Sequence, residues 1–289
     1  NEKDPFLYSA GETTQDFMPA NNNDLKEKWR NATDMQINAN LSWNGYNIIC
    51  NVDSIDYKKR RIYVNDKTNR WRISGSDAHN YDKPDWYYIE GVYEELDQPG
   101  EWYLDPKIGR LFYWPPDGTM NDKKVIAPKL SNIIKLEGDP IKSKHIDYIN
   151  FKGLTFAHTI YYDDYKEPRV ATDGAIQLIN ARNCKIEDCE IKHIGTNGIW
   201  LHYDCHNNTI SNNEIWDMGA GGVLTSGARL CHMGDESVIN ENRETWNYSP
   251  LNTIITNNYI HHGNQRFVYP PGIHIDSSPM RLRYKQHAY

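Results

Sequence analysis

The sequence predicts a parallel β-helix in the second half of the chain, and a repeat is the main observation behind this prediction. From about residue 145 onward, short segments rich in Ile and Val recur with Asn or Gly between them. One set contains Ile176, Ile199 and Val223, which follow one another at intervals of about 23 to 24 residues. A single repeat cannot bury its apolar side. Stacked coils can, because each strand pairs with its copies above and below.

A second set of matching segments supports the same fold. Asn207–Ile215 and Asn252–Ile260 are near copies of each other. Because side chains alternate along a strand, we expect the Ile columns to point into the coil. Asn side chains bond backbone well at bends, so the Asn column should form a ladder between coils. The three columns are Ile186, Ile210 and Ile255; Ile191, Ile215 and Ile260; and Cys189, Asn213 and Asn258.

The first part of the chain contains no repeat and is expected to form a separate β-rich unit. Within it, Glu101–Leu104 and Arg110–Trp114 are aromatic segments around a turn marked by Pro and Gly, which predicts a hairpin. We therefore divide the chain into a β-rich accessory unit, residues 1–140, and helix coils, residues 141–289. Arg281–Tyr289 does not continue the repeat. This predicts an incomplete helix, truncated at its C-terminal end.

Composition excludes several classes of partner. The net charge of -7 offers no basic surface for a phosphate backbone, so we expect no nucleic acid. No apolar run approaches the roughly 20 residues of a membrane span, so we expect no membrane partner. The 5 cysteines contain no Cys-x-x-Cys pair, and we expect neither a metal nor another cofactor. The 20 Tyr and 9 Trp suit a sugar-binding surface, although local packing in a strand-rich fold would also use them.

Several motifs are similar to those of one protein family. They are Glu101–Pro116, Asp173–Leu178, Ala181–His193, Asn197–Leu201 and Asp217–Val223. In these motifs the chain resembles the bacterial right-handed parallel β-helix proteins grouped near glycoside hydrolase families 141 and 120. The resemblance implies an all-β solenoid with a β-rich unit inserted near its N-terminus. It also implies a glycoside hydrolase acting on plant or algal polysaccharide or oligosaccharide, in a secreted or periplasmic protein.

Period-two alternation predicts where such a substrate would bind. If Ile176, Ile199 and Val223 point inward, their neighbours along each strand point outward. We expect these outward residues, walled by loops on a rigid scaffold, to form the substrate groove. The two outward rows are Gln177, Trp200, Leu224 and His274, and Ile179, His202, Ser226 and Asp276.

Glycoside hydrolysis requires two carboxyl groups. Asp217 ends a strand before a Gly-rich corner and matches a family motif, and Asp276 lies on the outer row, so these two are the predicted pair. His262 and His202 are predicted to assist proton transfer, because imidazole titrates near neutrality. Family members often carry an Asp where this chain has His262. The residues predicted to bind substrate hydroxyls or a uronate carboxylate are Trp200, His274, Arg243, Arg266, Tyr269 and Glu244.

Two other classes of protein are also compatible with the sequence. A β-helical polysaccharide lyase would use arginines as base and charge neutraliser on uronate substrates, commonly with Ca²⁺ held by clustered aspartates. Asp163 and Asp164 are the only adjacent pair of aspartates in the sequence. A non-catalytic glycan-binding or structural β-helix would need none of these groups. A hydrolase releases reducing sugar without an unsaturated product, and a lyase releases an unsaturated product. A binding protein binds glycan and releases neither.

Overall fold

The computed structural model divides the chain into two compact units, Asn1–Val125 and Ile126–Tyr289. The division lies closer to the N-terminus than the predicted residue 140, because β9 (Ile134–Glu137) already pairs with β13 (Gly174–Ile179) of the helix. Each unit is described by itself. The residues that the structure describes are 6–11, 13–14, 16–21, 24–25, 29–41, 46–65, 86–120, 123–139, 144–161, 173–226, 250–267, 271–276 and 283–285.

The first unit contains a six-stranded sheet in the order β1-β6-β3-β4-β5-β2, and the neighbouring strands of this sheet pair antiparallel. Ile37 and Ala39 of β3 are fully buried in its apolar core, and Asn38 between them is buried as well. Two short 3₁₀ helices, η1 (Ala32–Asp34) and η2 (Tyr93–Glu95), accompany the sheet. The strands are β1 (Leu7–Tyr8), β2 (Phe17–Pro19), β3 (Gln36–Leu41), β4 (Tyr46–Asp56), β5 (Arg61–Asn65) and β6 (Trp86–Glu90).

A separate hairpin of β7 (Trp102–Asp105) and β8 (Arg110–Tyr113) confirms the predicted aromatic hairpin. Its Tyr103 and Phe112 pack against Tyr93, with ring centroids 5.5 and 5.1 Å away. The β-rich character expected of this part of the chain is therefore correct.

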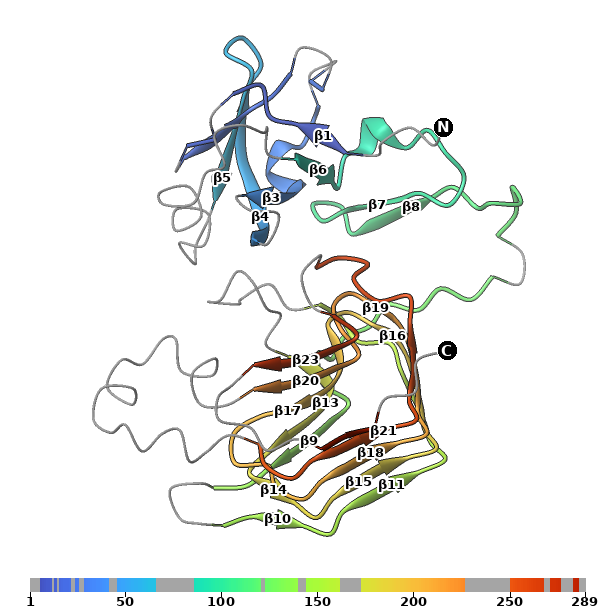
Figure 1. Ribbon diagram of the computed structural model, residues 1–289. Helices are drawn as coiled ribbons and strands as arrows, with labels where there is room; N and C mark the ends of the chain where they lie inside the picture. Colours follow the sequence, from blue (N-terminus) through green and yellow to red (C-terminus); the bar gives the residue numbers. More distant parts are fainter. Residues whose placement is uncertain are drawn as a thin grey trace. The chain divides into compact units, whose positions relative to one another are not determined.

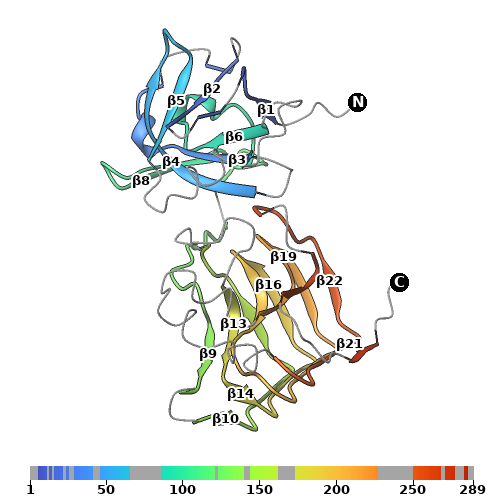
Figure 2. The same cartoon turned by 60° about the vertical axis from the view of Figure 1, so that its left-hand side comes forward.

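The second unit is a parallel β-helix (Figure 1). Its chain visits three sheets in turn, and each strand pairs in parallel with the equivalent strand of the next coil. Figure 2 shows β16 and β19 of the third sheet next to β22. The first sheet consists of β9, β13, β17 (Asn197–Leu201), β20 (Val223–Ser226) and β23 (Ile273–Asp276). The second consists of β11 (Asn150–Lys152), β15 (Lys185–Glu187), β18 (Thr209–Ser211), β21 (Ile254–Thr256) and β24 (Arg283–Lys285). The third consists of β12 (Thr155–Ala157), β16 (Glu190–Ile194), β19 (Glu214–Met218) and β22 (Tyr259–His261). A two-stranded sheet of β10 (Ile146–Asp147) and β14 (Ala181–Arg182) joins the first sheet to the second.

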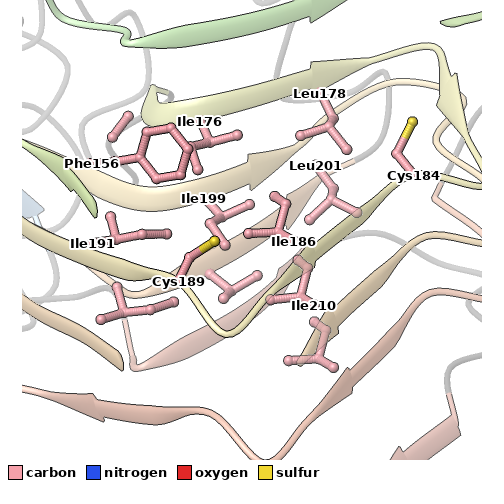
Figure 3. Packing of buried hydrophobic residues seen from close by; sticks show 14 of the residues in the cluster. Phe156, Ile176, Leu178, Cys184, Ile186, Cys189, Ile191, Ile199, Leu201 and Ile210 are labelled. Atoms are coloured by element: carbon pink, nitrogen blue, oxygen red, sulfur yellow. The ribbon is translucent and has the colours of Figure 1, made fainter. Parts of the chain in front are cut away.

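The observed register confirms both predicted Ile columns. Ile186, Ile210 and Ile255 are Cα partners in the second sheet. In the third sheet the same relation joins Ile191, Ile215 and Ile260. These side chains meet those of the first sheet in one apolar core (Figure 3). Each fully buried Ile contributes about 1.5–3 kcal/mol, so the columns supply much of the stability of the unit.

The Asn ladder is also confirmed. The Oδ1 atom of Asn213 accepts a hydrogen bond from the Cys189 backbone N–H at 2.9 Å, and its Nδ2 donates to the Ile186 carbonyl at 2.9 Å. Asn258 repeats the pattern one coil later, on Asn213 and Ile210. Each amide thus satisfies backbone groups that the bend leaves without a strand partner.

The corners of the coil use residues in the left-handed backbone region. Two corner columns consist mainly of Asn, Asp and Gly, which adopt a positive φ at low cost. Each column takes one residue from each successive coil. The two columns are Tyr148, Asn183, Asn207 and Asn252, and Gly153, Asp188, Asn212 and Asn257, all with φ between 52° and 66°.

One expectation at the C-terminal end is wrong. Arg283–Lys285, within the segment predicted to leave the repeat, forms β24 and pairs in parallel with β21. A strand can join the stack through backbone hydrogen bonds without the Ile and Asn pattern, which is why the sequence concealed it. Within the described part of the chain, no helix has the length and apolar character that crossing a membrane requires.

The two neighbouring residues Ile255 and Ile254 of β21 test the inward column. Ile255 is 4% exposed and Ile254 is 47% exposed. Ile255→Asp should lower the free energy of unfolding by at least about 3 kcal/mol, because it buries an unpaired charge. Ile254→Asp, the matched control, should cost about 1 kcal/mol or less. Urea denaturation measures both, and equal losses would contradict the inward assignment.

Candidate functional site

The face predicted to be the substrate groove is packed. Trp200 and His202 are only 5% and 8% exposed, and Leu224 and Ser226 are fully buried. The indole Nε1 of Trp200 donates a hydrogen bond to Ser226 Oγ at 2.7 Å, and its ring lies 4.1 Å from that of His202. The expectation that Trp200 and His202 line an open groove is therefore wrong. The row that contains Trp200 and Leu224 is therefore covered by other groups, although it points away from the coil interior.

The structure does not bring the predicted carboxylate pair onto one face. Asp217 lies near the end of β19 in the third sheet, whereas the backbone of Asp276 ends β23 in the first sheet. His274 belongs to β23 as well and is half-buried. Arg243, Glu244 and Tyr269 lie outside the described residues, as do Asp163 and Asp164. Asp217 and its own neighbours form the candidate site.

Asp217 occupies a third corner column, in which titratable residues replace the Asn and Gly of the other two. The histidine–aspartate column consists of His158, His193, Asp217 and His262, with φ of 67°, 54°, 54° and 52°. The strand register stacks them in successive coils. His193 Nδ1 lies 2.6 Å from Asp217 Oδ2, and the rings of His158 and His193 stack at 4.9 Å. Solvent reaches both members of the central pair, since the side chain of Asp217 is 45% exposed and that of His193 is 36% exposed.

The residues next to this column on the strands form an outward row, Lys192, Trp216 and His261. We call it the aromatic row after its two aromatic rings. The rings of Trp216 and His261 are parallel within 3°, 6.0 Å apart, and Lys192 Nζ lies 5.5 Å from the indole. The His193 ring meets Trp216 edge to face at 5.0 Å. The aromatic row therefore holds the histidine–aspartate column in place from one side.

A second outward row lies beyond the aromatic row and consists of Glu190, Glu214 and Tyr259. We call it the carboxylate row after its two glutamates. Glu214 Oε1 lies 3.3 Å from His261 Nε2. Glu190 accepts hydrogen bonds from Lys192 and Trp216, and the bond from Lys192 holds the pKa of Glu190 below its ordinary value. Tyr259 is 63% exposed, so its ring offers a flat surface to a ligand.

Glu214 and Asp217 form a pair with matching surroundings. Both lie on β19, and their side chains are 50% and 45% exposed. Each contacts a histidine from a neighbouring coil, Asp217 from the coil before and Glu214 from the coil after. Two accessible carboxyls, each beside an imidazole, are the groups that general acid–base chemistry needs.

Two of the other predicted residues lie near this pair. His262 belongs to the histidine–aspartate column, and its Nδ1 lies 2.6 Å from that of His261. Arg266 bonds through its backbone N–H to the Gly219 carbonyl, two residues after Asp217. The sequence reasoning missed His193, Glu214 and Trp216 as site residues. The Ile columns could have revealed them, because aligning Ile191, Ile215 and Ile260 also aligns the residues that follow.

A second group of charges, at the corner between the first and second sheets, has a structural role. The side chain of Asp204 is 9% exposed and accepts a hydrogen bond from Arg182 at 2.9 Å, and His206 Nε2 lies 3.0 Å from its Oδ1. Burial alone would raise the pKa of Asp204, but the bonds from His206 and Arg182 outweigh it and lower the pKa. Asp204 is thus a paired carboxylate enclosed by the corner. Among the described residues, no group of three or more His, Cys, Asp or Glu side chains is placed to hold a metal ion.

Comparisons with known proteins define the class of fold. Residues 141–284 match the family model described as "Right handed beta helix region". Together with the parallel sheets, this match shows that the second unit is a right-handed parallel β-helix.

A solved structure titled "Glycoside hydrolase" is similar in fold, with a TM-score of 0.73 and 14% sequence identity over 93% of this chain. The chain spans 52% of that structure, or about half its length. No curated protein matches the sequence.

The Asp204 corner gives a prediction of pH-dependent stability. Because the folded state lowers the pKa of Asp204, its contribution is present above the unfolded-state pKa and disappears as the pH falls through the folded-state pKa. Asp204→Asn should therefore lower the free energy of unfolding by about 1–3 kcal/mol at pH 7, with a difference from wild type that shrinks toward about pH 3. Urea denaturation across this range checks it. A difference independent of pH would mean that the carboxylate charge is irrelevant.

Proposed function

We propose that this chain is a glycoside hydrolase that cleaves plant or algal polysaccharide or oligosaccharide on the outer face of its third sheet. The observation that carries the proposal is the pair of exposed carboxyls on β19, Glu214 and Asp217, each beside a histidine. The name of the structural neighbour and the family-like motifs support the same class of reaction. Such a substrate suits a secreted or periplasmic protein.

In the inverting mechanism, two carboxyls about 6.5–9.5 Å apart leave room for the attacking water molecule. In the proposed reaction one carboxyl protonates the glycosidic oxygen. The other takes a proton from the water that attacks the anomeric carbon as the glycosidic C–O bond breaks.

The contacts suggest which carboxyl has which role. Asp217, whose carboxyl lies 2.6 Å from His193 Nδ1, is the proposed general base. Glu214, with a longer 3.3 Å contact to His261, is the proposed general acid. Tyr259 is the strand partner of Glu214, and its exposed ring suits the apolar face of a sugar.

A polysaccharide lyase is the second candidate, and the pair of histidines His261 and His262 favours it. In that reaction a base removes the proton beside a uronate carboxylate, and the leaving glycan departs as a carbon–carbon double bond forms. His262 would be the base and Arg266 the charge neutraliser. A lyase releases an ultraviolet-absorbing product, and a hydrolase does not.

Asp217→Asn and Glu214→Gln test the proposed hydrolase. Each should lower kcat by about 10²–10⁴-fold, because each removes a proton-transfer group, with little change in glycan binding or Tm. The assay is reducing-sugar release from a panel of plant and algal oligosaccharides, with ultraviolet absorbance recorded in parallel.

Asp188→Asn is the matched control. Asp188 is also a corner aspartate of positive φ with a side chain 45% exposed, but it lies in a different corner column. It should keep full activity. If the Asp217 variant also keeps full activity, this site is not the catalytic one, and an unsaturated product would establish the lyase instead.

A further inference from the structure

Tyr161 and Arg266 come from distant parts of the chain and meet at the corner beside the candidate site. The guanidinium carbon of Arg266 lies 3.8 Å from the centroid of the Tyr161 ring. Tyr161 follows β12 in one coil, and Arg266 follows β22 three coils later. The coils that contain β16 and β19 lie between these two segments.

Glycines in the two intervening coils let the flanking segments lie this close. A Cβ atom on Gly195 would lie 2.2 Å from the backbone of Ile160 and Tyr161. A Cβ atom on Gly219 would lie 2.1 Å from the Gly195 carbonyl oxygen. Any larger residue at either position would push the coils or the segment apart. The close approach of Tyr161 to this corner therefore depends on glycine.

The backbone also fixes Arg266 next to Asp217. The N–H groups of Arg266 and Phe267 both donate to the Gly219 carbonyl, at 2.9 and 2.7 Å. Phe267 is only 7% exposed and anchors the segment. Because Gly219 follows Asp217 by two residues, the backbone of Arg266 is held beside the corner that carries Asp217, and its guanidinium lies against Tyr161.

Stacking determines what this guanidinium can recognise. The Tyr161 ring lies against the guanidinium, and the N–H groups of a guanidinium point outward along the edges of its plane. A planar acceptor with two oxygens, such as a carboxylate, suits those edges in a bidentate arrangement. A neutral hydroxyl offers one oxygen and no charge, so it uses this arrangement poorly.

We propose that Arg266, held on Tyr161, is an anion-binding subsite, and that the glycan cleaved beside it carries a carboxylate, as a uronate residue does. This inference rests on the proposed function and specifies its substrate class. Arg266 supplies a cation at one edge of the site, while Asp217 and Glu214 supply the proton-transfer groups. The Tyr161 ring is a positioning group that acts through Arg266.

Binding of a matched pair of probes tests the subsite apart from turnover. Calorimetry would compare an oligogalacturonate with its methyl ester, using the full chain with Asp217→Asn to prevent cleavage. The acid form should bind at least about tenfold more tightly. Adding Arg266→Gln should abolish that preference and leave the affinity for the ester unchanged. Arg266→Lys should retain only part of it, because lysine lacks the planar fork.

Tyr161 supplies the control for positioning. Tyr161→Phe keeps the ring and should keep the preference, whereas Tyr161→Leu should lose it as Arg266→Gln does. Equal affinity for both probes, no binding of either, or an equal loss for both in Arg266→Gln would overturn the subsite. Preference for the acid form without hydrolysis would reject the proposed function alone. Hydrolysis of neutral glycans without that preference would reject the subsite alone.

Discussion

Backbone hydrogen bonding between successive coils is the constraint on which the second unit depends. Parallel pairing places each residue directly over its equivalent one coil away, so a side chain has the same kind of neighbour on both sides. The core then needs only an apolar residue at each inward position, and Ile meets that need in three successive coils of the second and third sheets. The same stacking places His193 on Asp217 and His261 over Trp216. Core and site are thus consequences of one register.

This register explains how much the sequence could reveal. The Ile columns, the Asn ladder and the aromatic hairpin were predictable, because each depends on a local pattern with a fixed period. Whether the outward face is open to solvent was not predictable. Alternation shows that Trp200 points away from the coil interior, but it does not show whether other groups cover that face, and here Trp200 is buried. The strand Arg283–Lys285 was concealed for a related reason, since backbone pairing alone leaves no pattern of side chains.

The candidate site was predictable only in part. Asp217 and His262 were identified from motif and chemistry, and they share one corner column. His193, which contacts Asp217, and Glu214, which contacts His261, were not identified as chemical groups from the sequence. Their contacts form only when three coils are stacked, since each contact joins residues about one coil or more apart in the sequence. A pairing such as Asp217 with Asp276 looks plausible from residue type alone, but it ignores the sheet to which each strand belongs.

The left-handed corner that carries Asp217 has a consequence for the evolution of such proteins. At this backbone geometry Asn, Asp and His are among the best-tolerated side chains other than Gly. Exchange among the three changes charge and proton affinity while the coil keeps its path. A helix of this kind can therefore gain or lose acid–base groups in single mutational steps, without first acquiring compensating changes in its core. The corner column allows new chemistry to arise on an unchanged scaffold.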